Sequence, residues 1–179
     1  MFDFIKSPIA GVYEIILPCH EDMRGSFSKV FHNTNFQEQG IDFHLRESYF
    51  SRSAKNVVRG MHFQLPPYQH HKVVYCPHGA IMDVALDLRR QSPTYGQFFS
   101  AELSAENHKA LFIPEGCAHG FKSLTDDAMT VYLVSSEYQR DADTGLLWNS
   151  FGLDWQCANP IMSDRDCSFQ TFGTFESPF

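Results

Sequence analysis

Apolar and polar residues alternate over short stretches along most of the chain, which is the pattern of β-strands. The clearest example is Ile81–Leu88, where apolar side chains alternate with Asp83, Ala85 and Asp87. Similar runs recur between turn-forming residues. The predicted strands are Gly11–Leu17, Ser26–His32, Phe43–Arg52, Val57–Gln64, His71–Cys76, Ala80–Leu88, Gln97–Leu103, Lys109–Ile113, His119–Leu124 and Ala128–Ser135. Helical periodicity is limited to Asn33–Gln39 and a segment after Pro160.

About ten short strands in a chain of 179 residues predict an all-β fold, either an antiparallel sandwich or a barrel such as a jelly roll. The residues Pro77-His78-Gly79 predict a short hairpin turn between two of the strands. The length suits a single domain spanning residues 1–179. The polar face of Ile81–Leu88 carries two carboxylates, which the pattern places in solvent. The alternative is a wet cavity inside the barrel.

Composition restricts the classes of partner. The net charge is −7 and no stretch is rich in Lys or Arg, so we expect no nucleic-acid partner, although a local cationic pocket can still bind one small anion. The sequence shows neither a signal peptide nor an apolar run of membrane-spanning length. The five cysteines are scattered and odd in number, which is typical of reduced thiols in a cytoplasmic protein. The 17 phenylalanines favour strands over helices.

Candidate chemistry is concentrated in Val58–Gln64 and at Lys72. His62 offers an imidazole, and Arg59 and Lys72 offer cations. A base with cations nearby suits the removal of a proton beside a carbonyl group. The alternative for His62 is a core histidine bonded to backbone. Strict alternation would place Arg59 and His62 on opposite faces of one strand, and a β-bulge at Gly60 would reconcile them.

Several segments and two single tyrosines carry a resemblance to a known family. They are Asp22–Phe27, Asn56–Gln64, Pro66-Pro67, Lys72–Val74, Gly79–Arg89, Ser92–Gly96, Leu103–Asn107, Ile113–Phe121, Tyr132, Tyr138, Gly145–Asn149 and Pro160–Asp166. Together they resemble, in order and over nearly the whole chain, the nucleotide-sugar 4-keto-6-deoxyhexose 3,5-epimerases, typified by dTDP-4-dehydrorhamnose 3,5-epimerase. The resemblance implies a cupin-type antiparallel jelly-roll barrel with short peripheral helices, and a homodimer. It also implies epimerisation at C3, C5 or both of a nucleotide-linked 4-keto-6-deoxyhexose, in deoxysugar biosynthesis for a surface polysaccharide or a natural product.

The resemblance assigns four catalytic residues. His62 is the base, and Asp166 is the carboxylate that pairs with it. Tyr132 is the acid on the opposite face of the sugar ring, and we expect nearby cations to lower its pKa. Lys72 stabilises the enolate oxygen, with Asp83 as its expected partner. The alternative role of Asp166 is helix capping, because it follows Ser163 at the spacing of a capping box.

The resemblance also assigns a binding set. Arg24 and Arg59 would hold the diphosphate, because a guanidinium matches phosphate oxygens. The full set of substrate-binding residues is Arg24, Lys29, Glu47, Tyr49, Arg59, His119, Tyr138, Asp143 and Arg165. The family usually has a glutamate at the position of Lys29 and Gln-Asp-Asn at the position of Glu47-Ser48-Tyr49. These changes fall in the expected nucleoside pocket, so the sequence leaves open whether dTDP, CDP or GDP carries the sugar.

We expect no metal and no cofactor at this site. Pro114–His119 resembles the second cupin motif, but Phe63-Gln64 follow His62 where a metal-binding cupin would continue a His-x-His pair. Three alternative functions remain. One is a monofunctional 3- or 5-epimerase acting on a CDP- or GDP-linked ketosugar, and another is a sugar 3,4-ketoisomerase. The third is a non-catalytic cupin module that binds a sugar nucleotide. Such a module should lose the acid–base set and keep the arginines, and here the acid–base set persists.

Overall fold

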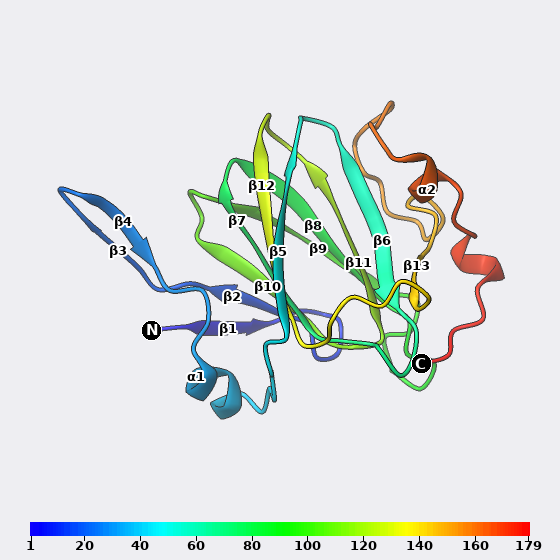
Figure 1. Ribbon diagram of the computed structural model, residues 1–179, viewed down its shortest axis with the longest axis horizontal. Coiled ribbons are helices and arrows are strands. Elements are labelled where there is room, and N and C mark those ends of the chain that lie inside the picture. The colour runs from blue at the N-terminus through cyan, green and yellow to red at the C-terminus, as the bar shows by residue number, and fades with distance from the viewer.

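Two antiparallel sheets face each other in the computed structural model, which describes residues 1–179 (Figure 1). The first sheet has the order β1 (Asp3–Lys6), β2 (Tyr13–Ile16), β10 (Lys109–Ile113), β7 (Lys72–His78), β12 (Ala128–Val134) and β5 (Glu47–Ser53). The second has the order β13 (Asp143–Gly145), β6 (Val58–Gln64), β11 (Cys117–Ser123), β8 (Ala80–Asp87) and β9 (Phe98–Ser104). Outside the sheets lie a hairpin, β3 (Cys19–Asp22) and β4 (Gly25–Ser28), the helices α1 (Asn33–Glu38) and α2 (Asp164–Cys167), and a 3-10 turn at Phe172–Thr174.

The all-β prediction with short peripheral helices is confirmed, and every predicted strand overlaps an observed one. Two boundaries are wrong by four residues: the strand predicted over Ser26–His32 ends at Ser28, and the one predicted from Phe43 begins at Glu47. The other boundaries agree to within two residues. Strands β1, β3 and β13 were not predicted. They are three or four residues long, so they contain too few alternating positions to stand out from the surrounding loops.

The hydrophobic residues form three layers. The central layer lies between the sheets and includes Val74, Leu111 and Phe121. A second layer packs α1 against the outer face of the first sheet, and a third packs the C-terminal segment against the outer face of the second. Most phenylalanines belong to these two outer layers: Phe2, Phe4, Phe31, Phe36, Phe43 and Phe112 in the first, and Phe63, Phe98, Phe151, Phe172, Phe175 and Phe179 in the other. The high phenylalanine content therefore serves mainly to cover the outside of the sheets.

The two carboxylates of β8 are buried, so their predicted place in solvent is wrong. Asp83 and Asp87 are both 0% exposed. The opposite face of β8, with Val84 and Leu86, packs beneath the C-terminal segment. Because this strand is covered on both sides, alternation separates its two faces but does not show which of them meets solvent. The carboxylate face therefore points between the sheets, but neither carboxylate lines a cavity as in the alternative interpretation.

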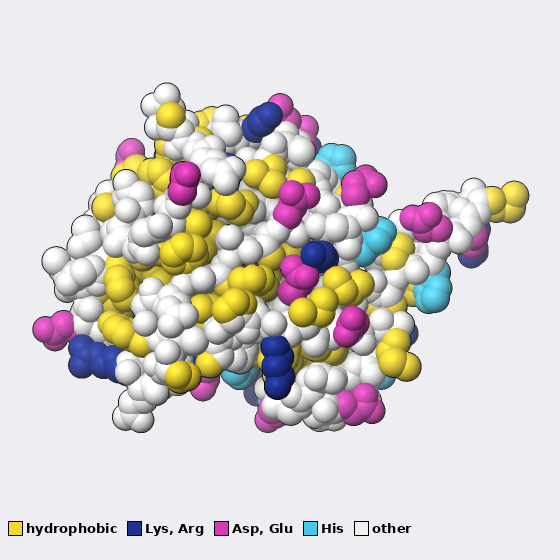
Figure 2. Space-filling view, turned by 180° about the vertical axis from the view of Figure 1, so that it is seen from behind, with side chains coloured by type: hydrophobic (Ala, Val, Ile, Leu, Met, Phe, Trp, Pro, Cys, Tyr) yellow, Lys and Arg dark blue, Asp and Glu magenta, His cyan; other side chains and the backbone are white.

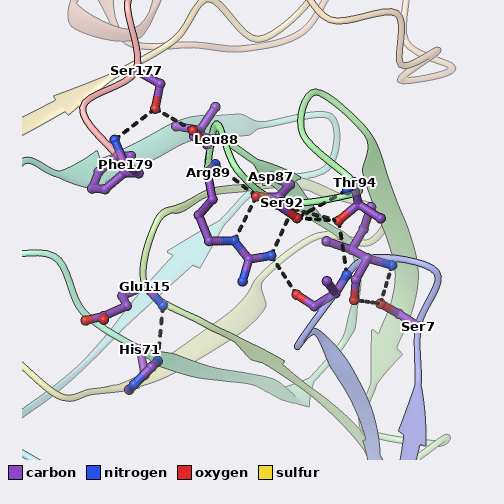
Figure 3. A network of polar contacts seen from close by, with 12 residues as sticks. Ser7, His71, Asp87, Leu88, Arg89, Ser92, Thr94, Glu115, Ser177 and Phe179 are labelled. Carbon is purple, nitrogen blue, oxygen red and sulfur yellow. Dashed lines mark hydrogen bonds and ion pairs between the residues drawn. The ribbon is translucent and has the colours of Figure 1, made fainter.

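Asp87 organises one end of the fold (Figure 3). Its carboxylate accepts hydrogen bonds from Arg89 Nε at 2.8 Å, Ser92 Oγ at 2.6 Å and Thr94 Oγ1 at 2.7 Å. Burial alone would raise the pKa of Asp87, but these bonds outweigh it and hold the pKa below its ordinary value. Arg89 also donates to the carbonyl of Ala10 at 2.6 Å, which ties the end of β8 to the N-terminal segment.

The β3–β4 hairpin, which we call the arm, extends away from the two sheets on the side opposite α2 (Figures 1 and 2). It carries two strongly exposed apolar side chains, Met23 at 101% and Phe27 at 64%. Neither of the two short helices, nor the 3-10 turn, is long and apolar enough to cross a membrane.

Candidate active site

A cavity of about 330 Å³ opens between the two sheets, with β5, β7 and β12 on one side and β6, β11 and β13 on the other. It gathers side chains that are far apart in the sequence. The lining residues are Glu47, Tyr49, Ser51, Arg59, His62, Phe63, Gln64, His70, Lys72, His119, Tyr132, Val134, Ser136, Tyr138, Asp143 and Arg165. The structure therefore brings most of the predicted site residues into one place.

A β-bulge on β6 turns both Arg59 and His62 toward this cavity. His62 pairs with His119 of β11 and Arg59 pairs with Phe121, so two residues of β6 stand opposite the single residue Gly120. Gly60 lies at the bulge with φ +129°, and a Cβ atom there would come within 2.5 Å of the Gly120 Cα. Only glycine fits both the conformation and the close approach. The bulge that would reconcile Arg59 with His62, which the sequence left open, is therefore present.

His62 and Asp166 form a hydrogen-bonded pair at the cavity wall. His62 Nε2 donates to Asp166 Oδ1 at 2.8 Å, and the backbone N–H of Gly60 donates to Asp166 Oδ2 at 3.0 Å. Burial raises the pKa of Asp166, but the bonds from His62 and Gly60 outweigh it and keep the pKa below its ordinary value. Asp166 therefore remains a carboxylate that fixes the Nε2–H tautomer, which leaves the lone pair of His62 on Nδ1.

The capping interpretation of Asp166 is confirmed for one half of the capping box, the bond from the Asp166 backbone to Ser163. The side chain of Ser163 accepts a hydrogen bond from the backbone N–H of Asp166 at 3.1 Å and caps α2. The two roles are compatible because the capping bond uses the backbone of Asp166 while its carboxylate faces β6. The short helix α2 thus sets the position of the carboxylate beside the histidine.

Tyr132 is buried on β12 between two aromatic neighbours. Its ring stacks on that of Tyr49, with centroids 4.7 Å apart and an interplanar angle of 22°. The ring of His119 meets it edge-on at 5.6 Å. The expectation that cations lower the pKa of Tyr132 is wrong, because burial raises that pKa well above its ordinary value and Arg59 only partly offsets the effect. Tyr132 is therefore a protonated phenol.

Lys72 lines the cavity and is almost fully buried. Its Nζ donates to the carbonyl oxygen of His62 at 3.3 Å. Burial lowers the pKa of Lys72 to about 8, although the carboxylates of Asp143 and Asp83 act in the opposite direction. The ammonium is thus partly desolvated and close to titration at neutral pH, which makes it responsive to negative charge that develops in the cavity.

Asp83 makes its direct contact with His119 and not with Lys72 as predicted. His119 Nε2 donates to Asp83 Oδ1 at 2.6 Å, and both side chains are almost fully buried. Burial raises the pKa of Asp83 and lowers that of His119. The position of Asp83 on the strand beside β11 places its carboxylate next to His119, and Lys72 feels it only as a nearby charge.

The outer part of the cavity is polar and partly exposed. Arg59 Nε donates to Ser53 Oγ at 3.1 Å and forms no ion pair, so its charge is free for a ligand. Arg165 is held by Asp143 Oδ2 at 2.6 Å.

At the rim, the backbone N–H of Tyr138 donates to Glu47 Oε2 at 2.7 Å, so Glu47 positions the loop that carries this tyrosine. The Tyr138 side chain itself remains 59% exposed.

Two predicted binding residues lie elsewhere. Arg24 and Lys29 belong to the arm and to the residues directly after it, and neither lines the cavity. Arg24 instead pairs with Asp22 at 2.5 Å. The arm points away from the body of its own chain, so within one chain these cations do not reach the other site residues (Figure 1).

Six lining residues were not predicted: the apolar Phe63 and Val134, and the polar Ser51, Gln64, His70 and Ser136. His70 is the most distinctive, because burial lowers its pKa to about 3 and its Nε2 has no hydrogen-bond partner. The sequence spacing could have predicted its place in the cavity, because His70 lies two residues before Lys72 and the two therefore share a face. His71 points away, and its Nδ1 accepts from the backbone N–H of Glu115 at 3.1 Å (Figure 3).

Comparison with known proteins gives consistent matches. The family model described as dTDP-4-dehydrorhamnose 3,5-epimerase matches residues 6–174. An enzyme of that name from Shigella flexneri is 42% identical over 171 residues, which is 94% of each chain. The crystal structure of dTDP-6-deoxy-D-glucose-3,5-epimerase from Legionella pneumophila in complex with dTDP-4-keto-L-rhamnose has a TM-score of 0.94 and 29% identity, covering 98% of this chain and 95% of that one. The crystal structure of a 3'-monoepimerase from Streptomyces bikiniensis in complex with dTDP-quinovose has a TM-score of 0.89 and 31% identity. The match covers 94% of this chain and 87% of that one.

Proposed function

The chain belongs to the dTDP-4-dehydrorhamnose 3,5-epimerase family, and on this basis we propose that it epimerises a dTDP-linked 4-keto-6-deoxyhexose at C3, C5 or both. The observation that carries the proposal is the His62–Asp166 pair, which shares one cavity with Lys72 and Tyr132. A base, a buried cation and a protonated phenol are the groups that this isomerisation needs. The product would enter deoxysugar biosynthesis for a surface polysaccharide or a natural product.

The first step is the removal of a proton. The C4 ketone acidifies the C–H bonds at C3 and C5, because the resulting carbanion delocalises onto oxygen as an enolate. Nδ1 of His62 takes the proton, and Asp166 stabilises the imidazolium that forms. Lys72 then holds the enolate oxygen, and the growing negative charge favours its ammonium form.

The second step returns a proton to the opposite face of the ring. Tyr132 is the donor, since its raised pKa keeps it protonated in the free enzyme. The tyrosinate that forms is stabilised by Arg59, whose positive charge partly offsets the burial that raises the phenol pKa. His119, oriented by Asp83, contacts the sugar between these groups.

The nucleotide occupies the outer part of the cavity. Arg59 and Arg165 bind the diphosphate, and Tyr138 packs against the nucleoside. Glu47, Tyr49 and Asp143 complete this part of the site. The family relatives support dTDP as the carrier. The family's Gln-Asp-Asn stretch is replaced here by Glu47-Ser48-Tyr49, which keeps CDP- and GDP-linked sugars as alternatives for the test below.

We also infer that the protein is a homodimer of cupin-type domains, each comprising residues 1–179, and that it works in the cytoplasm. Two features support the dimer. Arg24 and Lys29 lie on or beside an arm that does not reach the cavity of its own chain, and the arm exposes the apolar side chains of Met23 and Phe27. In a dimer, the arm of one subunit can bring both cations to the cavity of the other. The five free cysteines fit a reducing compartment.

A single-centre epimerase is the second candidate. The stack of Tyr49 on Tyr132 restricts the movement of the proposed acid, which favours delivery of a proton to one carbon. One structural relative is a 3'-monoepimerase.

The deciding experiment incubates the protein in deuterated water with dTDP-, CDP- and GDP-linked 4-keto-6-deoxyhexoses and follows C3 and C5 by NMR. Exchange at both carbons of the dTDP sugar supports the 3,5-epimerase, and exchange at one carbon selects the single-centre enzyme. Lack of exchange with every donor would overturn the proposed function.

A further inference from the structure

Three side chains of the types that serve as ligands for transition metals converge at the base of the arm. They are Cys19 and Glu21 on β3 and His108 in the turn between β9 and β10. Their ligand atoms, one thiol sulfur, one carboxylate oxygen and one ring nitrogen, all lie within 4.8 Å of one another. None of the three side chains makes a hydrogen bond or an ion pair with another group. They are separate from the cavity described above.

The backbone fixes this convergence without help from the three side chains. Cys19 and Glu21 are two residues apart on β3 and therefore share a face. His108 adopts a left-handed conformation with φ +51°, and its carbonyl accepts from the N–H of Leu17 at 2.9 Å. The Asn107 side chain shapes the turn by accepting from the backbone N–H of Ser104 at 3.0 Å. The turn is thus attached to the chain two residues before β3 begins.

From this geometry we propose that Cys19, Glu21 and His108 form a binding site for a divalent transition metal of the zinc type. A thiolate, an imidazole and a carboxylate are the three kinds of ligand that Zn²⁺ and Co²⁺ accept in tetrahedral sites. Three protein ligands leave the fourth position for water. Ligand atoms of such a site lie roughly 3.5 Å apart, so the side chains need to close by about 1 Å. Glu21 is exposed and Cys19 and His108 are partly exposed, which leaves room for this adjustment.

Metal binding would join the arm to the body of the protein. In the observed structure the arm is a two-stranded hairpin that stands clear of both sheets (Figure 2). An ion held by β3 and by the β9–β10 turn would connect the base of this hairpin to the body of the protein. The site is independent of the proposed epimerase chemistry, because its ligands touch none of the residues assigned to proton transfer. Its effect falls on the rigidity of the segment that leads to Arg24 and Lys29.

The test uses cobalt as a spectroscopic substitute for zinc. The full-length protein is stripped of metal with a chelator and titrated with Co²⁺. We expect one ion per chain and a near-ultraviolet thiolate-to-cobalt charge-transfer band, which Zn²⁺ abolishes by competition. Cys19→Ser and His108→Ala should each remove the band, whereas Cys157→Ser should retain it. His20→Ala is the matched control, because His20 lies on the same strand and faces the other side.

Stability provides a second readout. We expect Zn²⁺ to raise the Tm of the wild-type protein and of His20→Ala and to leave the Tm of Cys19→Ser unchanged. The metal-free Tm of Cys19→Ser should equal that of the wild type, which shows that the variant folds. A charge-transfer band that survives in Cys19→Ser, or wild-type protein that takes up no Co²⁺, would overturn the proposed site.

Discussion

The ring of Tyr49 lies nearly parallel to the ring of Tyr132, with 4.7 Å between centroids. Tyr49 stands on the edge strand β5 and Tyr132 on its neighbour β12, where the two residues are direct partners in the register. This contact joins a residue of the proposed nucleoside pocket to the proposed general acid. It therefore couples the proposed nucleotide end of the cavity to the proposed proton transfer.

Removing the stack should loosen the acid. We expect Tyr49→Ala to lower kcat by about 10- to 100-fold, because small displacements of a reacting group have effects of this size. It should also change the ratio of deuterium incorporated at C3 and C5. Tyr49→Phe keeps the ring and should retain both kcat and the ratio. Equal loss in the two variants would show that the hydroxyl group of Tyr49 matters and that the stack does not.

Asp166 should act through the histidine. We expect Asp166→Asn to lower kcat by about 10²- to 10⁴-fold, because an amide neither stabilises the imidazolium nor fixes the required tautomer. Affinity for dTDP should change little, since Asp166 does not line the cavity. Asp164→Asn is the control on the same helix, and its rate should match the wild type. Steady-state kinetics together with calorimetric dTDP binding separates the two effects.

The alkaline limb of kcat/KM should report Lys72. Its pKa is lowered by burial to about 8, so its ammonium is lost and activity falls as the pH rises through about 8. Tyr132 cannot account for this limb because its pKa lies well above its ordinary value. Asp143 raises the pKa of Lys72, so Asp143→Asn should move the limb to lower pH. Asp141→Asn, an exposed neighbour, should leave it in place. An unmoved limb in Asp143→Asn would assign the titration to another group.

Mixed dimers test the crossing of the arm. Arg24→Ala and His62→Ala each disable one half of the proposed site and should each be inactive. If the arm serves the partner, a mixed dimer has one site with both defects and one intact site. Random pairing in equal amounts should then restore about a quarter of wild-type activity. If the arm serves its own chain, every site carries one defect and no activity returns.

The sequence was most informative where one strand carried several constraints. In Val58–Gln64, the conflict between alternation and a shared pocket pointed to a bulge at Gly60, and the register with β11 confirms it. The partner of His62 came from the family resemblance, because Asp166 is far along the chain and no local pattern joins them.

The sequence was least informative about which side chains are buried and about which side chains lie close enough to the cavity to line it. Asp83 and Asp87 lie on a strand that is covered on both faces, so alternation could not place them. The pKa of Tyr132 depends on desolvation by the whole fold, and nearby cations do not overcome it. Arg24 and Lys29 were grouped with the cavity residues by resemblance, although the direction of the arm separates them within one chain.

The most direct test of the account is proton exchange by His62→Asn compared with the wild type. Both proteins are incubated with the dTDP-linked 4-keto-6-deoxyhexose in deuterated water, and dTDP binding is measured to verify that the variant retains its fold. The account predicts deuterium at C3, C5 or both with the wild type, and none with the variant, while dTDP binds equally well to the two. Exchange by His62→Asn at the wild-type rate would contradict the assignment of His62 as the base.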